Sequence, residues 1–108
     1  MTKVIHVSQR GALTDAEYVY IGRPSQWGNP FTVELHGREQ AIRLYVEWLI
    51  RQPALLNAIV PELRGKTLGC WCVPKACHGD VLARLAEGCS FADLDAHPFA
   101  VGHVFRAE

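Results

Sequence analysis

The sequence has no excess of either charge and no long hydrophobic run, and these absences exclude several classes of protein. Its 108 residues include 11 lysines and arginines and 11 aspartates and glutamates, so the formal net charge is zero. Without a basic excess, long duplex nucleic acid is not expected as a partner, whereas a nucleotide or a strand end is still compatible with the composition. No run approaches the roughly 18 apolar residues of a membrane span, so no membrane partner is expected either.

The N-terminus lacks the apolar core and the cleavage site of a signal peptide. We therefore expect a cytoplasmic protein, in which thiols stay reduced, and the four cysteines are expected to be free. An apolar fraction of 49% and a charged fraction of 20% are typical of one folded domain, here residues 1–108. The composition predicts no oligomeric state.

Hydrophobic periodicity predicts strands and helices in the order β–β–α–α–β–α. Strands are expected at 3–7, 16–21 and 67–72, and helices at 37–52, 54–60 and 78–87. Pro61 is expected to end or kink the second helix. Alternating residues at 99–105 are compatible with a last edge strand. This order predicts an α/β fold: a single domain with a small, mostly parallel sheet of three to four strands and flanking helices.

One segment, residues 70–80 (CWCVPKACHGD), concentrates the residues that carry chemistry. Three of the four cysteines and one of the five histidines lie in it. It joins a predicted strand to a predicted helix, and α/β proteins bind ligands at such corners. If the strand runs to residue 72, Cys70 and Cys72 point to the same face, while Cys77 and His78 begin the helix.

Three interpretations of this segment are open. Cys70, Cys72, Cys77 and His78 are zinc-ligand types, although C-x-C followed by C-H is an unusual spacing for a structural zinc site. Alternatively, the helix N-terminus lowers the pKa of Cys77, which acts as a nucleophile with His78 as acid or base. Asp80 would then cap the helix, receive a proton or orient His78. In the third interpretation the cysteines only pack, in a non-catalytic interaction domain.

A second segment, residues 20–31, is rich in glycine and proline and predicts a tightly folded loop. Its candidate ligand-binding residues are Tyr20, Gly22, Arg23, Ser25, Trp27 and Asn29. Arg23 suits a phosphate or carboxylate, and Trp27 suits stacking on a planar ring. The alternative is that Trp27 closes the core while Arg23 pairs with a surface carboxylate.

These segments resemble a small bacterial and phage family known only as a domain of unknown function. Its members carry YIGRPS-x-WGNPF-like, GREEAI-x-x-Y-x-x-W-like and LRGK-x-L-x-CWC-x-P-x-x-CHGDVL-like motifs, matched here at 20–31, 37–48 and 63–82. The resemblance covers most of residues 18–87. It implies an α/β fold and a shared site near Arg23, Trp27, Asn29, Cys70, Cys72, Cys77, His78 and Asp80, but no particular reaction. A more distant similarity is to another α/β family, in which a Cys-His-Arg motif follows a strand that ends in cysteine. In the present sequence Gly79 stands in place of that arginine, so no role of the arginine transfers.

Together the two segments predict a site for a small anionic, planar ligand such as a nucleotide. Arg23 and the helix N-terminus would bind the anion, Trp27 the ring, and Cys77 with His78 would carry any catalysis. The cofactor prediction is none or zinc. A structural zinc module and an interaction domain remain the alternatives, and enzymatic activity is left open.

Overall fold

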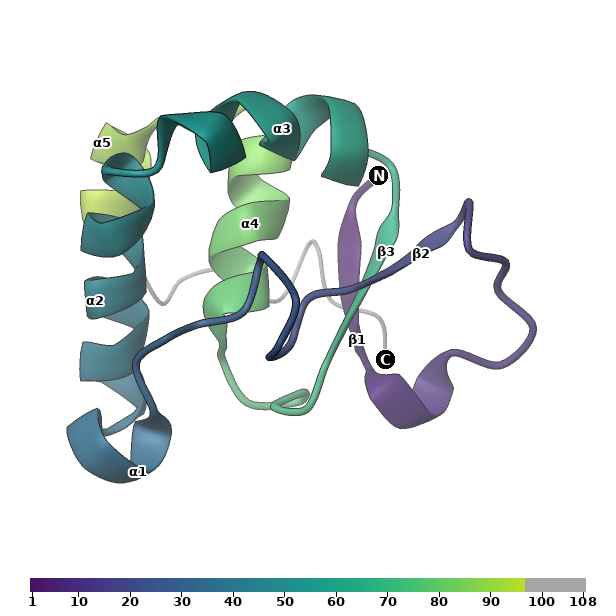
Figure 1. Ribbon diagram of the computed structural model, residues 1–108, viewed down its shortest axis with the longest axis horizontal. Helices are drawn as coiled ribbons and strands as arrows, with labels where there is room; N and C mark the ends of the chain where they lie inside the picture. The colour runs from purple at the N-terminus through teal and green to yellow at the C-terminus, as the bar shows by residue number, and fades with distance from the viewer. Residues whose placement is uncertain (97–108) are drawn as a thin grey trace.

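In a computed structural model, the chain folds into a small parallel sheet flanked by helices (Figure 1). The structure describes residues 1–96 and the side chains of residues 1–94. The strands are β1 (Lys3–His6), β2 (Tyr18–Tyr20) and β3 (Thr67–Cys70). They lie in the order β1–β3–β2, and both pairings are parallel. The predicted α/β class and single domain are confirmed. The expected strand at 99–105 lies outside the described residues.

The central strand, β3, is buried along its whole length, as expected for a parallel strand with a neighbour on each side. Lys3 of β1 and Tyr18 of β2 are both in register with Thr67. Gly69 is required beside β2 because a Cβ atom there would lie 2.0 Å from the Tyr18 hydroxyl oxygen. The absence of a side chain at residue 69 therefore lets the Tyr18 ring lie close to β3.

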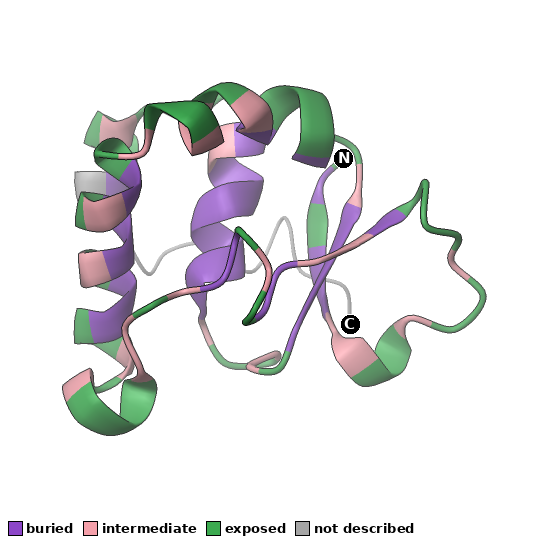
Figure 2. Ribbon diagram, in the orientation of Figure 1, coloured by how far each residue is buried: buried purple, intermediate pink, exposed green. Residues whose placement is uncertain are grey.

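Helices enclose one side of the sheet. They are α1 (Val33–His36), α2 (Arg38–Ile50), α3 (Pro53–Leu63), α4 (His78–Ala86) and α5 (Phe91–Ala96), with a 3-10 turn at Val7–Gln9. Helix α4 lies between α2 and the sheet, and α3 crosses one end of both helices (Figure 1). All residues of α4 except Leu85 are buried, so this helix is the centre of the core (Figure 2). None of the helices described here is long and apolar enough to cross a membrane.

The predicted apolar face of the first long helix is confirmed in α2. Ala41, Ile42, Tyr45 and Leu49 are buried at steps of three and four residues. Trp48 is half-buried, and its ring centroid lies 5.5 Å from that of Tyr45. This face fixes how the N-terminus of α2 approaches the site described below.

Two predicted boundaries differ from the structure. Helix α3 continues through Pro61 to Leu63, because Leu63 is fully buried on the same side as Ile59 and holds the last turn against the core. Strand β3 ends at Cys70 rather than at residue 72. Its partner strands end opposite residues 69 and 70, so no neighbour extends the sheet, and the chain turns instead, with the amide of Lys75 donating to the carbonyl of Cys72.

Candidate functional site

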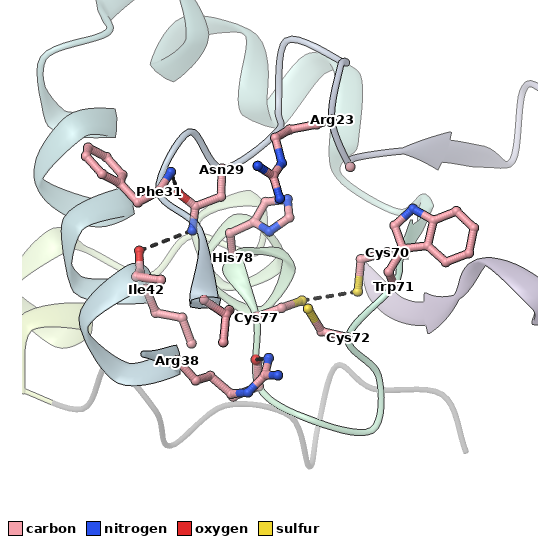
Figure 3. Close-up of a pocket in the computed structure, with 14 residues that line it drawn as sticks. Arg23, Asn29, Phe31, Arg38, Ile42, Cys70, Trp71, Cys72, Cys77 and His78 are labelled. Atoms are coloured by element: carbon pink, nitrogen blue, oxygen red, sulfur yellow. Dashed lines mark hydrogen bonds between the residues drawn. The ribbon is translucent and has the colours of Figure 1, made fainter. Parts of the chain in front are cut away.

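A pocket opens at the carboxyl ends of β2 and β3, where the two segments singled out in the sequence meet (Figure 3). This is the usual place for a ligand site in an open parallel sheet. The N-termini of α2 and α4 approach it from the helix side. The pocket is lined by Gly22, Arg23, Asn29, Phe31, Val33, Arg38, Ala41, Ile42, Cys70, Trp71, Cys72, Ala76, Cys77 and His78.

Hydrogen bonds fix the loop after β2. The Asn29 side-chain amide donates to the carbonyl of Ala41 in α2 at 3.1 Å, and its oxygen accepts from the amide of Phe31 at 2.9 Å. Asn29 therefore ties the loop to α2, in addition to lining the pocket. Arg23 is exposed and reaches the pocket from this loop.

Tyr20 has a positioning role rather than a place in the pocket lining. Its hydroxyl donates to the carbonyl of Arg23 at 2.8 Å and accepts from Trp71 Nε1 at 2.9 Å. The Trp71 ring also meets His6 edge-on, with ring centroids 5.8 Å apart. Through these contacts β1 and β2 hold the exposed Trp71 ring at the rim of the pocket.

Trp27 and Ser25 do not reach the pocket. Trp27 is only 3% exposed and belongs to the hydrophobic core, where its carbonyl accepts from the hydroxyl of Tyr45 at 2.8 Å. The prediction that Trp27 stacks on a ligand is therefore wrong, because its ring is covered by protein. Ser25 Oγ accepts from the Trp27 amide at 3.3 Å and stabilises the turn. Gly22 does line the pocket, as predicted.

Three thiols gather on the other side of the pocket. The sulfur atoms of Cys70 and Cys77 lie 3.2 Å apart (Figure 3). Cys77 also interacts with Cys72. Cys70 and Cys77 are buried, Cys72 is half-exposed, and all are free. Cys77 is thus the middle member of a cluster that we call the thiol cluster, consisting of Cys70, Cys72 and Cys77.

Electrostatics lower the pKa values of Cys72 and Cys70 but not that of Cys77. The hydrogen bond from Cys77, followed by that from Arg38, lowers the pKa of Cys72 to about 5. The pKa of Cys77 is raised well above its ordinary value, because hydrogen bonding with Cys70 and Cys72 favours its protonated form and burial disfavours its thiolate. The prediction of a Cys77 thiolate is therefore wrong: the neighbouring sulfur atoms outweigh the helix N-terminus.

His78 faces the β2 end rather than the thiols. Its Nε2 lies 2.7 Å from the carbonyl oxygen of Ile21, and a carbonyl only accepts, so Nε2 carries the proton. Burial lowers the pKa of His78 to about 4, so the ring is neutral at physiological pH. With Nε2 committed to Ile21 in this way, His78 is a structural partner of the β2 end and not the acid or base expected for Cys77.

Asp80 caps α4, one of the roles predicted for it. Its Oδ2 accepts from the amide of Cys77 at 3.0 Å, and Cys77 Sγ accepts from the amide of Gly79 at 3.3 Å. This reciprocal arrangement is a capping box, with Cys77 at the N-cap. The carboxylate is 1% exposed and does not line the pocket.

A family described as "Domain of unknown function (DUF4326)" matches residues 5–88. The chain belongs to this family. The family resemblance predicted from the motifs is thereby confirmed, and the matched region extends beyond 18–87 to include the last two residues of β1. The chain is 34% identical over 98 residues to "Uncharacterized protein R718" of Acanthamoeba polyphaga mimivirus, covering 73% of this chain and 74% of the relative.

A second relative of this DUF4326 chain comes from Enterobacteria phage T4. It is the "Uncharacterized 12.4 kDa protein in nrdA-td intergenic region", 40% identical over 72 residues, with 64% of this chain and 67% of the relative covered. No solved structure matches the chain. The relatives therefore support membership of the family, and the chemistry has to be argued from the site itself.

The four residues of this DUF4326 chain that were predicted as possible zinc ligands do not come together around one point. Within residues 1–96, no group of three or more histidine, cysteine or acidic side chains is placed to hold a metal ion. At this corner His78 Nε2 is bonded to the carbonyl of Ile21, so this nitrogen does not turn toward the thiols. The expected four-ligand set of Cys70, Cys72, Cys77 and His78 is not assembled.

Among the pocket residues that sequence reasoning missed, Phe31, Arg38 and Trp71 bring an aromatic ring or a charge. Arg38 is the first residue of α2, and its Nη1 donates to the carbonyl of Ala76 at 2.8 Å, which brings the guanidinium to the thiol cluster. Trp71 is 64% exposed, an unusual state for a tryptophan. A signal for Trp71 was available, because it alternates with the two cysteines of C-x-C.

Proposed function

We propose that this pocket binds a small anionic molecule with a planar ring, such as a nucleotide or a similar compound. The observation that carries the proposal is the charge of the lining: Arg23 and Arg38 both line the pocket, whereas none of its lining residues within the described part of the chain is an aspartate or glutamate. Two guanidinium groups without a carboxylate between them form a site for phosphate or carboxylate oxygen atoms.

The two arginines have different freedom. Arg38 is half-buried and held by the carbonyl of Ala76, so its position is set before any ligand arrives. Arg23 is exposed on the loop after β2. Figure 3 shows Arg23 and Arg38 on opposite sides of the thiol cluster. A fixed guanidinium and an adjustable one together suit an anion that is bound from two sides.

Aromatic rings flank the same pocket. Phe31 and Trp71 line it from the loop and from the end of β3, and Figure 3 shows them on opposite sides. Tyr20 and His6 hold the Trp71 ring, so its exposure is not a consequence of freedom to move. Rings held at a pocket rim can stack on a planar group at little entropic cost.

The size of the pocket limits the bound part of the ligand. The cavity has a volume of about 110 Å³ and is open to solvent. That space suits one ring system or one phosphate group, and the rest of a nucleotide would lie along the open side. This favours recognition of a terminal group over enclosure of the whole molecule.

If the protein is an enzyme, Cys72 is the residue that would attack the ligand. Its half-exposed thiol lines the pocket and is hydrogen-bonded by Arg38, while Cys70 and Cys77 are buried behind it. A thiolate beside a cation is the usual form of a nucleophilic cysteine.

The proposal is tested by isothermal titration with nucleoside monophosphates, the corresponding nucleosides and inorganic phosphate. We expect a monophosphate to bind more tightly than its nucleoside. Arg23→Gln should weaken that binding about tenfold, since a charge-assisted hydrogen bond contributes about 1.5–3 kcal/mol. Arg51→Gln is the matched control, because Arg51 is also exposed but does not line the pocket.

Failure of the whole panel to bind at millimolar concentration would contradict the proposal. An equal loss in Arg23→Gln and Arg51→Gln would contradict it as well, because binding would then depend on net charge and not on the pocket.

A further inference from the structure

The thiol cluster is an unusual arrangement for cysteines that only pack. The sulfur of Cys77 lies 3.2 Å from that of Cys70, Cys77 also interacts with Cys72, and all three line one pocket, yet they come from the end of a strand, a turn and a helix N-cap. Cys72 lies in the turn, outside the strand pairing, and it alone of the three is half-exposed. The cluster therefore runs from the pocket wall into the core.

We propose that the thiol cluster is a thiol–disulfide exchange centre, in which Cys72 attacks a small-molecule disulfide and Cys77 resolves the mixed disulfide. The proposal rests on the part of the proposed function that assigns reactivity to Cys72. It does not require that the bound anion is a nucleotide.

The chemistry balances with a low-molecular-weight disulfide, RSSR, as the oxidant. The Cys72 thiolate attacks one sulfur of RSSR, which forms a Cys72–SR bond and releases RS⁻. The Cys77 thiol loses its proton and attacks Cys72 Sγ, forming the Cys72–Cys77 disulfide and releasing the second RS⁻. Both released thiolates are protonated to RSH. Two protein thiols are oxidised, and one RSSR is reduced to two RSH.

The geometry supports these roles. A disulfide needs sulfur atoms about 2.0 Å apart, so two interacting thiols of one pocket lining, such as Cys72 and Cys77, have to approach each other for the bond to form. Cys72 can make that approach because it belongs to the turn, whereas Cys77 is fixed by the capping box of α4. Arg38 lies beside Cys72, and together with Arg23 it would attract an anionic disulfide to the pocket.

The third thiol, Cys70, has a supporting role. It is 2% exposed, so a disulfide in solution cannot reach it before it reaches Cys72. Its contact with Cys77 places a sulfur atom on the far side of the resolving thiol and offers a second partner for exchange. Cys70 is therefore dispensable for the first two steps.

The test uses oxidised glutathione as the probe and mass spectrometry of the intact chain after acid quenching. At pH 5.5 an ordinary thiol is only about 0.1% ionised, so an acidic thiolate should react at least about tenfold faster, even after allowance for its lower nucleophilicity. The wild type and Cys70→Ser should lose two hydrogen atoms by forming the Cys72–Cys77 disulfide, identified by peptide mapping. Cys77→Ser should stop at glutathione attached to Cys72.

Cys89→Ser is the matched control, because Cys89 lies after α4 and outside the pocket lining; it should react like the wild type. Unchanged kinetics in Cys72→Ser, or a Cys77→Ser chain that takes up no glutathione, would overturn the inference. If a monophosphate binds but no disulfide forms, only this inference fails. If the disulfide forms but no anion of the panel binds, only the ligand proposal fails.

Discussion

The sulfur atoms of Cys70 and Cys77 lie 3.2 Å apart and join the end of β3 to the start of α4. This contact favours the protonated form of Cys77, and Cys72 is the half-exposed member of the three thiols that line the pocket. The reactivity expected at the helix N-terminus therefore moves from residue 77 to residue 72. The same shift explains why the motif is C-x-C followed by C-H and not a lone cysteine before the helix.

Selective alkylation of Cys72 is the first prediction. Since Cys77 and Arg38 hold the pKa of Cys72 at about 5, iodoacetamide should modify Cys72 first at pH 5.5, where ordinary thiols are almost fully protonated. The rate should rise with pH to a plateau with its midpoint near 5. Peptide mapping at a series of times measures this, with Cys89 of the same chain as the internal reference.

Replacement of Cys77 supplies the control for that profile. Cys77→Ala removes the largest cause of the low Cys72 pKa, so the midpoint should move upward while Cys72 stays accessible. A midpoint that is unchanged in Cys77→Ala would show that the contact between these two residues does not set the acidity of Cys72.

The sequence predicted the class of fold because its signals were local. The apolar stripe of α2 and the buried segment of β3 follow from the spacing of apolar residues, and the mixed order of strands and helices predicts an α/β sheet. The end of β3 was missed by two residues, because it depends on where β1 and β2 stop, and no local pattern at residue 72 records this.

The sequence predicted the position of the site, but it did not predict which side chains line the pocket or what each of them does. Both segments do meet at one pocket, yet Trp27 belongs to the core, while Trp71 and Arg38 line the pocket. The sequence alone does not show which of two loop tryptophans is buried. In the fold, Trp27 is buried beside Tyr45, whose hydroxyl donates to the Trp27 carbonyl, whereas Trp71 is exposed. Likewise, the acidity of Cys72 arises from Cys77 and Arg38, which converge on it only in the fold.

The buried His78 predicts a pH-dependent stability. Burial lowers its pKa from 6.5 to about 4, so the unfolded chain takes up a proton below pH 6.5 while the folded chain does not. The free energy of unfolding should therefore be highest above pH 6.5 and should fall as the pH decreases from 6.5 to 4. His78 alone should account for a decrease of about 3 kcal/mol. Urea denaturation at a series of pH values measures the slope.

His78→Gln is the variant that isolates this effect. The glutamine amide can still donate to the carbonyl of Ile21 in place of Nε2, but it does not titrate. The variant should keep most of its stability at pH 7 and lose the extra slope between pH 6.5 and 4. The same slope in both proteins would mean that other groups cause the acid sensitivity.

Close packing of α4 on Ile21, the residue after β2, and on Val4 of β1 predicts a specific coupling between Gly79 and Ile21. A Cβ atom at residue 79 would lie 2.7 Å from Ile21 Cδ1 and 3.1 Å from Val4 Cγ1. Gly79→Ala should therefore destabilise the chain by about 1–3 kcal/mol through overpacking. Ile21→Val removes the Cδ1 methyl group and should cost about 0.5–1.5 kcal/mol by itself.

Together these two changes should cost less than the sum of the single changes, because the valine leaves space for the new methyl group. Urea denaturation of the four proteins in the cycle gives the coupling free energy. Strict additivity would show that the clash with Ile21 is not what excludes a side chain at residue 79.

Removal of the Tyr20 hydroxyl is expected to weaken ligand binding more than it lowers the stability of the fold. It bridges the carbonyl of Arg23 and Nε1 of Trp71. In Tyr20→Phe both bonds are lost at an exposed place, so the free energy of unfolding should fall by only about 1 kcal/mol or less. Arg23 and Trp71 would lose their fixed positions, and monophosphate binding should weaken several-fold, as measured by isothermal titration.

Acrylamide quenching of tryptophan fluorescence gives a readout of Tyr20→Phe that needs no ligand. Trp71 is the exposed tryptophan, since Trp27 is buried and Trp48 half-buried, so a released Trp71 ring should be quenched more strongly. Tyr18→Phe is the matched control: Tyr18 is in the same strand, but its hydroxyl lies over Gly69, away from the pocket lining. If both variants bind and quench alike, the bridge from Tyr20 does not position the pocket, because loss of any β2 hydroxyl would then have the same effect.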